Sequence, residues 1–173
     1  MGLEGRRGSR VFLTGFMGAG KSTAGRALAA RLGVPLVDLD AEVERAAGST
    51  VAEIFERHGE ARFRALESAA LARCGELEAC VVATGGGAPI DSRNRAWMAE
   101  HGQVIWLDLP FAALRGRLAG AADRPLGRDP RQAEKLFRER LPAYRECDLR
   151  IAADGRTVDE IADEIAAHLA RER

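Results

Sequence analysis

The sequence has very few lysines and no surplus of charge of either sign. Lys21 and Lys135 are the only lysines, so arginine supplies the other 24 of the 26 basic residues, and the formal net charge is 0. Proteins that bind nucleic acid usually carry a basic surface. The charge balance therefore argues against nucleic acid as a main partner.

The sequence also lacks long apolar runs. No stretch approaches the roughly 20 apolar residues of a membrane-spanning helix. Residues 1–10 are polar and rich in glycine, without the apolar core of a signal peptide. We therefore expect no membrane partner, and we expect residues 1–9 to form a flexible N-terminal tail.

Cysteine and histidine are scarce and scattered. The three cysteines are odd in number and form no C-x-x-C pair, which argues against a disulfide framework or a zinc site and favours a reducing cytoplasm. His58, His101 and His168 stand singly. Isolated histidines are more typical of surfaces and helix ends than of metal sites.

The remaining composition, 46% hydrophobic and 30% charged over 173 residues, is typical of one globular domain, which we expect to span residues 10–173. Short apolar runs alternate with helical patterns, and this predicts an α/β fold: a parallel sheet with helices on both faces. We expect strands at 11–13, 34–38, 80–84, 104–107 and 149–152, and helices at 23–32, 39–47, 50–57, 60–73, 92–101, 110–118, 131–144 and 158–169.

Three features interrupt these patterns. Gly59 is expected to break a long helical stretch. Residues 119–130 combine glycine, two prolines, aspartate and arginine with little apolar periodicity, which predicts a mobile loop. Pro142 is expected to kink the helix that follows or to end it early.

The stretch Gly15–Thr23 matches the phosphate-binding pattern G-x-x-x-x-G-K-[ST], between an expected strand and an expected helix. Its glycines allow backbone N–H groups to turn around a phosphate, and the helix N-terminus favours the same anion. Lys21 would add a positive charge for the β- and γ-phosphates, and the Ser22 hydroxyl would ligate Mg²⁺. The alternative is a glycine-rich turn with a chance lysine.

Two aspartates follow the second expected strand. Ligands of parallel sheets bind beyond the carboxyl ends of the strands, so Asp38 and Asp40 should meet the phosphate loop there. Alternation along a strand would place both carboxylates on the same side. One would orient Mg²⁺ through its waters, and the other would orient a substrate hydroxyl or accept its proton. The alternative is a solvated turn with Asp40 capping the next helix.

Other candidates are weaker when taken alone. The run Gly85–Gly87, directly after a strand, allows close approach of a ligand to the backbone, or it is an ordinary glycine turn. Arg64 and Glu67 are spaced to pair on a helix, usually on a solvated face. Arg124 and Arg140, each close to a proline, are individually typical of surface residues.

Taken together, these pieces closely resemble the shikimate kinase family, in the family's order and over about residues 10–170. The matching pieces are Gly15 to Thr23; Asp38-Leu39-Asp40; Gly59-Glu60 with Phe63-Arg64 and Glu67; Thr84-Gly85-Gly86-Gly87; Arg124-Pro125-Leu126; and Arg140-Leu141-Pro142-Ala143-Tyr144.

The resemblance implies a P-loop kinase domain with a nucleoside-monophosphate-kinase-like, three-layer fold, a five-stranded parallel sheet of order 2-3-1-4-5 and a lid near 119–130. It also implies that ATP, with Mg²⁺, phosphorylates the 3-hydroxyl of shikimate in aromatic amino-acid synthesis. We expect the chain to act as a monomer.

The resemblance further assigns residues to these roles. The implied catalytic residues are Lys21, Asp38, Asp40 and Arg124. The implied ATP-binding residues are Gly18, Ala19, Gly20, Lys21, Ser22, Thr23, Arg117 and Arg124. Shikimate would be bound by Asp40, Arg64, Gly85, Gly86, Gly87 and Arg140, and Mg²⁺ would be held at Ser22 and Asp38.

Two other functions remain as alternatives. The first is another small-molecule kinase of the same fold, such as a gluconate or nucleotide kinase; the two arginines and the run Thr84–Gly87 argue against it. The second is a non-catalytic relative that binds a ligand and regulates a partner, and the intact Lys21 and aspartates argue against that. Whether Asp38 or Asp40 takes the proton is left open by the sequence.

Overall fold

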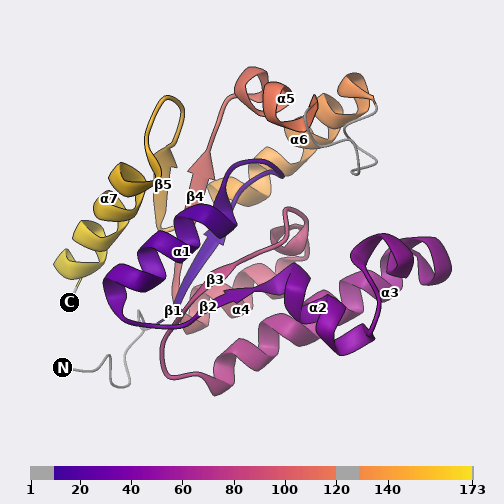
Figure 1. Ribbon diagram of the computed structural model, residues 1–173, viewed down its shortest axis with the longest axis horizontal. Coiled ribbons are helices and arrows are strands. Elements are labelled where there is room, and N and C mark those ends of the chain that lie inside the picture. The colour runs from indigo at the N-terminus through magenta and orange to yellow at the C-terminus, as the bar shows by residue number, and fades with distance from the viewer. Residues whose placement is uncertain (1–9, 120–128, 173) are drawn as a thin grey trace.

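The computed structural model describes residues 10–119 and 129–172, so the predicted tail (1–9) and most of the predicted lid (119–130) lie outside the described residues. The five strands pair in parallel in the order β2-β3-β1-β4-β5 (Figure 1). This confirms the order expected from the resemblance. The strands are β1 Arg10–Thr14, β2 Leu36–Asp38, β3 Cys80–Ala83, β4 Gln103–Asp108 and β5 Leu149–Ala152.

Helices cover both faces of the sheet. In Figure 1, α1 and α7 lie together on one side, and α2, α3 and α4 lie on the other. None of the helices within residues 10–119 and 129–172 combines the length and the apolar character that crossing a membrane requires. The helices are α1 Lys21–Leu32, α2 Leu39–Ala47, α3 Val51–Arg73, α4 Ser92–His101, α5 Phe111–Ala119, α6 Pro130–Arg145 and α7 Val158–Arg171, with short 3-10 turns at Cys74–Glu76 and Ala88–Ile90.

The central strand β1 shows why helices cover both faces of the sheet. Successive side chains of a strand point to opposite faces. Val11 and Leu13 are buried in one cluster together with Ile165 of α7. Phe12 is buried in a second cluster together with Met98 of α4. Because three successive residues, Val11 to Leu13, are apolar, neither face of this strand can remain in water.

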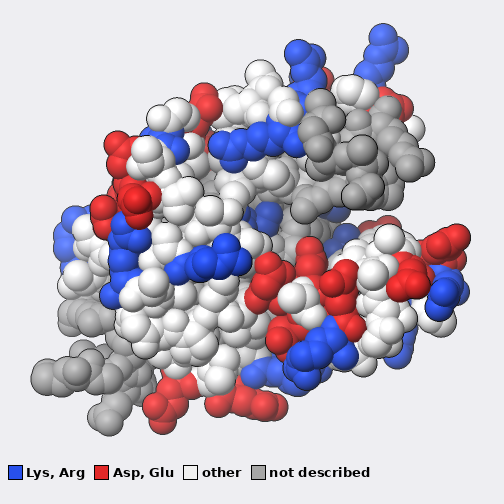
Figure 2. Space-filling view, viewed as in Figure 1, with Lys and Arg blue, Asp and Glu red and all other residues white. Residues whose placement is uncertain are grey.

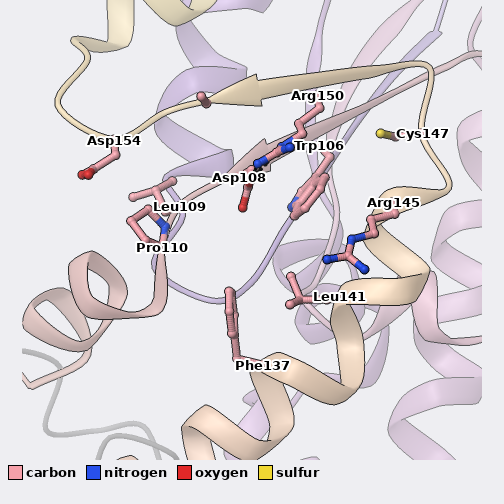
Figure 3. Close-up of a pocket in the computed structure, with 11 residues that line it drawn as sticks. Trp106, Asp108, Leu109, Pro110, Phe137, Leu141, Arg145, Cys147, Arg150 and Asp154 are labelled. Carbon is pink, nitrogen blue, oxygen red and sulfur yellow. Dashed lines mark hydrogen bonds and ion pairs between the residues drawn. The ribbon is translucent and has the colours of Figure 1, made fainter.

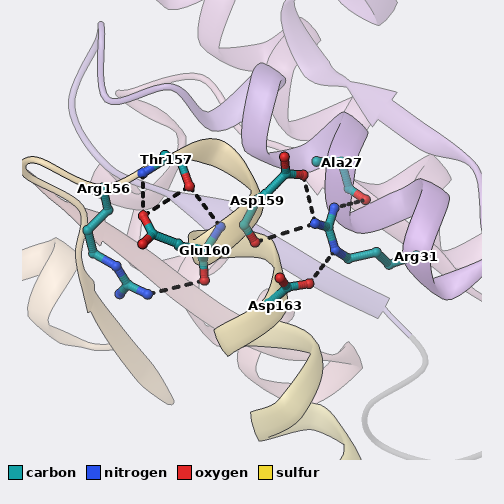
Figure 4. Close-up of polar contacts among 7 residues, drawn as sticks. All are labelled: Ala27, Arg31, Arg156, Thr157, Asp159, Glu160 and Asp163. Carbon is teal, nitrogen blue, oxygen red and sulfur yellow. Dashed lines mark hydrogen bonds and ion pairs between the residues drawn. The ribbon is translucent and has the colours of Figure 1, made fainter.

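Ion pairs join α7 to α1 (Figure 4). Arg31, near the end of α1, pairs with Asp159 at 2.7 Å and with Asp163 at 2.6 Å. The first turn of α7 is closed by a capping box, in which Thr157 and Glu160 satisfy each other's backbone N–H groups. These contacts are exposed and therefore add little stability, but they fix where α7 begins against α1.

Three local expectations are tested by the backbone. The break in α3 is confirmed, because Gly59 has φ 76° and ψ 175° inside that helix. Helix α1 begins at Lys21, two residues before the expected start, because Gly20 with φ 90° already takes the N-cap position. The early end at Pro142 is wrong: α6 continues to Arg145, and the buried Tyr144 holds its last turn against the protein.

Candidate active site

The phosphate loop has the backbone that its glycines predict. Gly15, Gly18 and Gly20 all have positive φ, at 139°, 79° and 90°. A Cβ on Gly15 would lie 2.7 Å from the carbonyl oxygen of Leu107, so a side chain there would collide with β4 as well as strain the backbone. The loop leads directly into the N-terminus of α1, where free N–H groups favour an anion.

Two cations lie at this loop, one from the loop itself and one from a distant part of the chain. Lys21 as a whole is 9% exposed, and its ammonium group donates to the carbonyl oxygens of Gly15 and Phe16 at 2.8 and 2.9 Å. Arg117, from α5, donates through Nη1 to the carbonyl oxygen of Gly18 at 3.0 Å. The structure therefore places Arg117 beside the phosphate loop. Ala19 is buried in the loop, whereas Thr23 is exposed on the first turn of α1.

Asp38 connects the phosphate loop to the end of β2. The Ser22 hydroxyl donates to Asp38 Oδ2 at 2.7 Å. Asp38 Oδ1 accepts from the N–H groups of Asp40 and Ala41 at 3.1 and 3.3 Å, which makes Asp38 the N-cap of α2. Two expectations are therefore corrected. Asp40 lies in the first turn of a helix rather than on a strand, so strand alternation does not place it, and the helix cap is Asp38, not Asp40.

The Ser22 and Asp38 oxygens fit a magnesium ion. Mg²⁺ prefers hard oxygen ligands and is usually held by one or two protein groups together with phosphates and water. Within the part of the chain that the structure describes, no group of three or more His, Cys, Asp or Glu side chains is arranged to hold a metal ion. This pair is therefore suited to an ion that arrives with a nucleotide, and not to a cage made of protein alone.

The glycine run after β3 is packed against charged groups. A Cβ on Gly85 would collide with Glu67 Oε1 and would lie 3.1 Å from Asp40 Oδ1. A Cβ on Gly87 would collide with the guanidinium group of Arg64. Asp40 and Arg64 are therefore neighbours of the glycine run.

Gly86 lies between the phosphate loop and α6. A Cβ there would lie 3.3 Å from the backbone nitrogen of Met17 and 3.4 Å from Arg140 Nη1. The Arg140 guanidinium carbon lies 5.8 Å from the centre of the Phe16 ring. These contacts bring Arg140 to the same place as the phosphate loop, although sequence spacing alone could not show it.

Arg64 is held in place by two glutamates of its own helix. Its Nη1 pairs with Glu67 Oε2 at 2.8 Å, and its Nη2 pairs with Glu60 Oε1 at 3.2 Å. Its guanidinium carbon lies 5.1 Å from the centre of the Phe63 ring. The guanidinium plane is therefore fixed before any ligand arrives.

Glu67 corrects the expectation of a solvated pair. Its side chain is 0% exposed, and among the described residues Oε1 has no hydrogen-bond partner. Burial raises the pKa of Glu67, the positive charge of Arg64 opposes that rise, and the negative charge of Asp40 adds to it. The sequence held a signal for this burial, because Phe63, Glu67 and Leu71 are spaced four apart along one face of α3.

A separate hollow of about 540 Å³ lies between α6 and the strands β4 and β5 (Figure 3). Its walls include Trp106, Phe137 and Leu141, with Arg145 and Arg150. It is lined by none of the residues expected to bind ATP, Mg²⁺ or the acceptor. The remaining expected site residue, Arg124, lies outside the described residues.

Known proteins are similar to this chain in sequence and in fold. The sequence model of the shikimate kinase family matches residues 17–170. A shikimate kinase of Ruegeria pomeroyi is 46% identical over 164 residues, which cover 92% of this chain and 84% of that relative. One of Geobacter sulfurreducens is 46% identical over 162 residues, covering 92% and 90%. A solved shikimate kinase from Acinetobacter baumannii, described as a complex with shikimate, superimposes with a TM-score of 0.89 at 34% identity over 95% of this chain and 94% of that one. The chain belongs to the shikimate kinase family.

Proposed function

We propose that this protein transfers the γ-phosphate of ATP to the 3-hydroxyl of shikimate, giving shikimate 3-phosphate and ADP. One observation supports this most directly: Gly86 adjoins both the phosphate loop, through Met17, and the acceptor side, through Arg140. A phosphoryl donor and an acceptor bound on either side of Gly86 would meet in a common cleft. Phosphoryl transfer depends mainly on such positioning and on neutralisation of charge.

On the donor side, the phosphate loop would hold the triphosphate. Residues Gly18 to Thr23 supply backbone N–H groups and the N-terminus of α1. Lys21 would exchange its carbonyl partners in the loop for phosphate oxygens, and Arg117 would lie beside the nucleotide. Arg124, from the lid, would reach the transferring phosphate and help to exclude water.

On the acceptor side, Arg64 and Arg140 would bind the carboxylate of shikimate. Each guanidinium group offers two parallel N–H donors to a planar carboxylate. The salt bridges and the ring contact of Arg64 hold it in one orientation, which lowers the entropy that binding must overcome. Gly85, Gly86 and Gly87 would present backbone N–H groups close to the substrate.

Ser22 and Asp38 would hold Mg²⁺ together with the ATP phosphates. When bound, the ion would neutralise the charge that develops on the phosphate oxygens. Both oxygens of Asp38 already serve other partners, namely the Ser22 hydroxyl and the first N–H groups of α2. Asp40, which lies beside Gly85 on the acceptor side, would orient the 3-hydroxyl and accept its proton.

The two alternative functions receive less support. A gluconate or nucleotide kinase would not need two arginines beside a glycine run, and a non-catalytic relative would not need to keep Lys21, Asp38 and Asp40 around one cleft. We also propose that the protein is a cytoplasmic monomer. Sedimentation should then show a single species near 18.6 kDa.

The deciding experiment is a coupled assay of ADP release with ATP and Mg²⁺. We expect turnover with shikimate, and none with gluconate, with nucleoside monophosphates or without an acceptor. Asp40→Asn should lower kcat by about 10²-fold, in line with loss of a general base. Glu42→Gln, which removes the carboxylate that pairs with Arg45 on the same helix, should leave kcat unchanged. Equal turnover of gluconate and shikimate would overturn the assignment.

A further inference from the structure

Tyr144 is the only tyrosine in the chain, and the proposed function leaves it without a role. Its side chain is 1% exposed, and its hydroxyl donates to the carbonyl oxygen of Gly86 at 2.5 Å. On its other side, its ring stacks on Trp106 with ring centres 6.2 Å apart. A residue of α6 is thus attached directly to the glycine run that follows β3.

The same helix face carries Arg140, one turn before Tyr144. Arg140 Nη1 approaches Gly86 from one side, within 3.4 Å of the position of a Cβ, and the Tyr144 hydroxyl holds its carbonyl oxygen. Within the described part of the chain, no hydrogen bond from the N–H groups of Gly86 and Gly87 is present. The carbonyl of Gly86 is therefore committed to the protein, while these N–H groups remain for a ligand.

The hydrogen bond from Tyr144 sets the direction of a neighbouring N–H group as well as that of the Gly86 carbonyl. A trans peptide is planar, with its C=O and N–H groups pointing in opposite directions, and no peptide bond among the described residues is cis. Fixing the C=O of Gly86 thus fixes the direction of the N–H of Gly87, which lies beside Arg64. Without this restraint, two adjacent glycines would let the peptide plane rotate at little energetic cost.

The Tyr144 hydroxyl remains a hydrogen-bond donor at neutral pH. Burial raises the pKa of Tyr144 to about 12, although the nearby Arg140 charge opposes the rise. The hydroxyl therefore stays protonated at neutral pH and continues to donate. Stacking on Trp106 limits rotation of the ring, so that the O–H group stays directed at Gly86.

We propose that Tyr144 is a positioning residue for the acceptor substrate: its hydrogen bond to Gly86 sets the peptide plane that presents the N–H of Gly87 to shikimate beside Arg64. The inference rests on the proposed function, because it requires shikimate to bind at the glycine run. It assigns to α6 a second task besides carrying Arg140. Gly86 also adjoins the phosphate loop through Met17, but its carbonyl oxygen accepts from Tyr144, so we expect the ATP site to change little when this hydrogen bond is lost.

Tyr144→Phe tests the proposal, since it removes the hydroxyl and keeps the ring that packs on Trp106. We expect kcat/KM for shikimate to fall about tenfold, the range of one well-placed hydrogen bond, with KM for ATP changed by less than about twofold. Ile165→Val is the matched control. It removes one buried methyl group from α7, in the same hydrophobic cluster as Tyr144 but on a different helix, and should lower the melting temperature without changing either kinetic constant.

A second measurement follows the ¹⁹F resonance of labelled Tyr144 when shikimate is added. Because the chain has one tyrosine, labelling with 3-fluorotyrosine gives one protein ¹⁹F resonance. We expect that saturating shikimate, added without nucleotide, will shift this resonance. An unshifted resonance, or a Tyr144→Phe protein that loses only thermal stability as Ile165→Val does, would overturn the proposal.

The two possible failures are distinguishable. If the wild-type protein shows no shikimate-dependent release of ADP, the proposed function fails, and this inference fails with it. If the wild-type protein is active and Tyr144→Phe has the same kcat/KM for shikimate, only the positioning role fails.

Discussion

At the scale of single residues, the rarity of lysine provides a matched pair for testing the phosphate loop. Lys21→Ala should lower kcat/KM by at least about 10²-fold, because it removes a charge held in place by the loop carbonyls. Lys135→Ala removes the only other lysine, which is exposed and pairs with Glu139 at 3.8 Å, and should change little. Both are measured by coupled ADP release. Equal losses in the two variants would show that Lys21 acts only through folding.

The buried Glu67 leads to a prediction about pH. Burial raises its pKa in the folded state, so the folded protein holds this proton more tightly than the unfolded chain. The stability contributed by this group is complete below the unfolded pKa, about 4.3, and is lost as the pH rises through the folded pKa. Because Arg64 lowers that pKa, Arg64→Ala should lose more stability at pH 7.5 than at pH 4.5.

The measurement is urea unfolding at both pH values. At pH 7.5, Arg64→Ala should cost about 3 kcal/mol, in the range for leaving a buried charge unpaired. Adding Glu67→Gln to that variant removes the charge and should remove most of the pH dependence. Arg62→Ala, on an exposed position of the same helix, is the control. An equal loss for Arg64→Ala at both pH values would mean that Glu67 is not the responsible group.

The sequence predicted some residues of the site and not others, for physical reasons. The phosphate loop was predictable, because local spacing alone determines it. Asp38 and Asp40 were placed at the right edge because they follow β2, but the arrangement expected from strand alternation was wrong, since Asp38 is the N-cap of α2. The contact of Tyr144 with Gly86 joins positions 58 residues apart, and no local pattern encodes such a contact.

At the scale of secondary-structure elements, strands and helices were predicted where apolar periodicity is strong, as in β4 and α7. Some observed boundaries differ from the expected ones because of the local backbone. For example, Gly20 takes the N-cap position, so α1 begins earlier than expected. Pro142 failed as a terminator because a packed residue, Tyr144, lies beyond it. The strand order came from the family resemblance and not from periodicity, since alternating strands and helices are compatible with several orders.

Two glycines test the break in α3. Gly59→Ala should cost about 1–3 kcal/mol of stability, because φ 76° with ψ 175° is a backbone region that essentially only glycine adopts. Gly116→Ala, inside α5, should instead stabilise by about 0.5–1 kcal/mol. An added Cβ at either position would meet no heavy atom within 4 Å. Changes in packing therefore do not contribute to the difference in stability between the two variants. Urea unfolding measures both, and the same sign for the two variants would contradict the explanation.

At the scale of the whole molecule, side chains of opposite charge occupy different places around one hollow. Figure 2 shows acidic side chains gathered over α2, next to a hollow with basic side chains at its floor. Lys21, Arg64 and Arg140 come from three different helices, and the fold brings them to the same rim of the sheet. The proposed donor side and the proposed acceptor side use different residues of that rim, so the two ligands should act separately on stability.

This separation gives a final prediction, measured by thermal unfolding. Shikimate at about 100 times its Kd should stabilise the wild-type protein by about 2.7 kcal/mol, which corresponds to about 5–10 °C for a chain of this length. ADP with Mg²⁺ should give a shift of its own. At the same ligand concentrations, Arg64→Ala should lose most of the shikimate shift and keep the ADP shift, and Lys21→Ala should do the reverse. If either variant abolished both shifts, the donor and acceptor sites would not be independent.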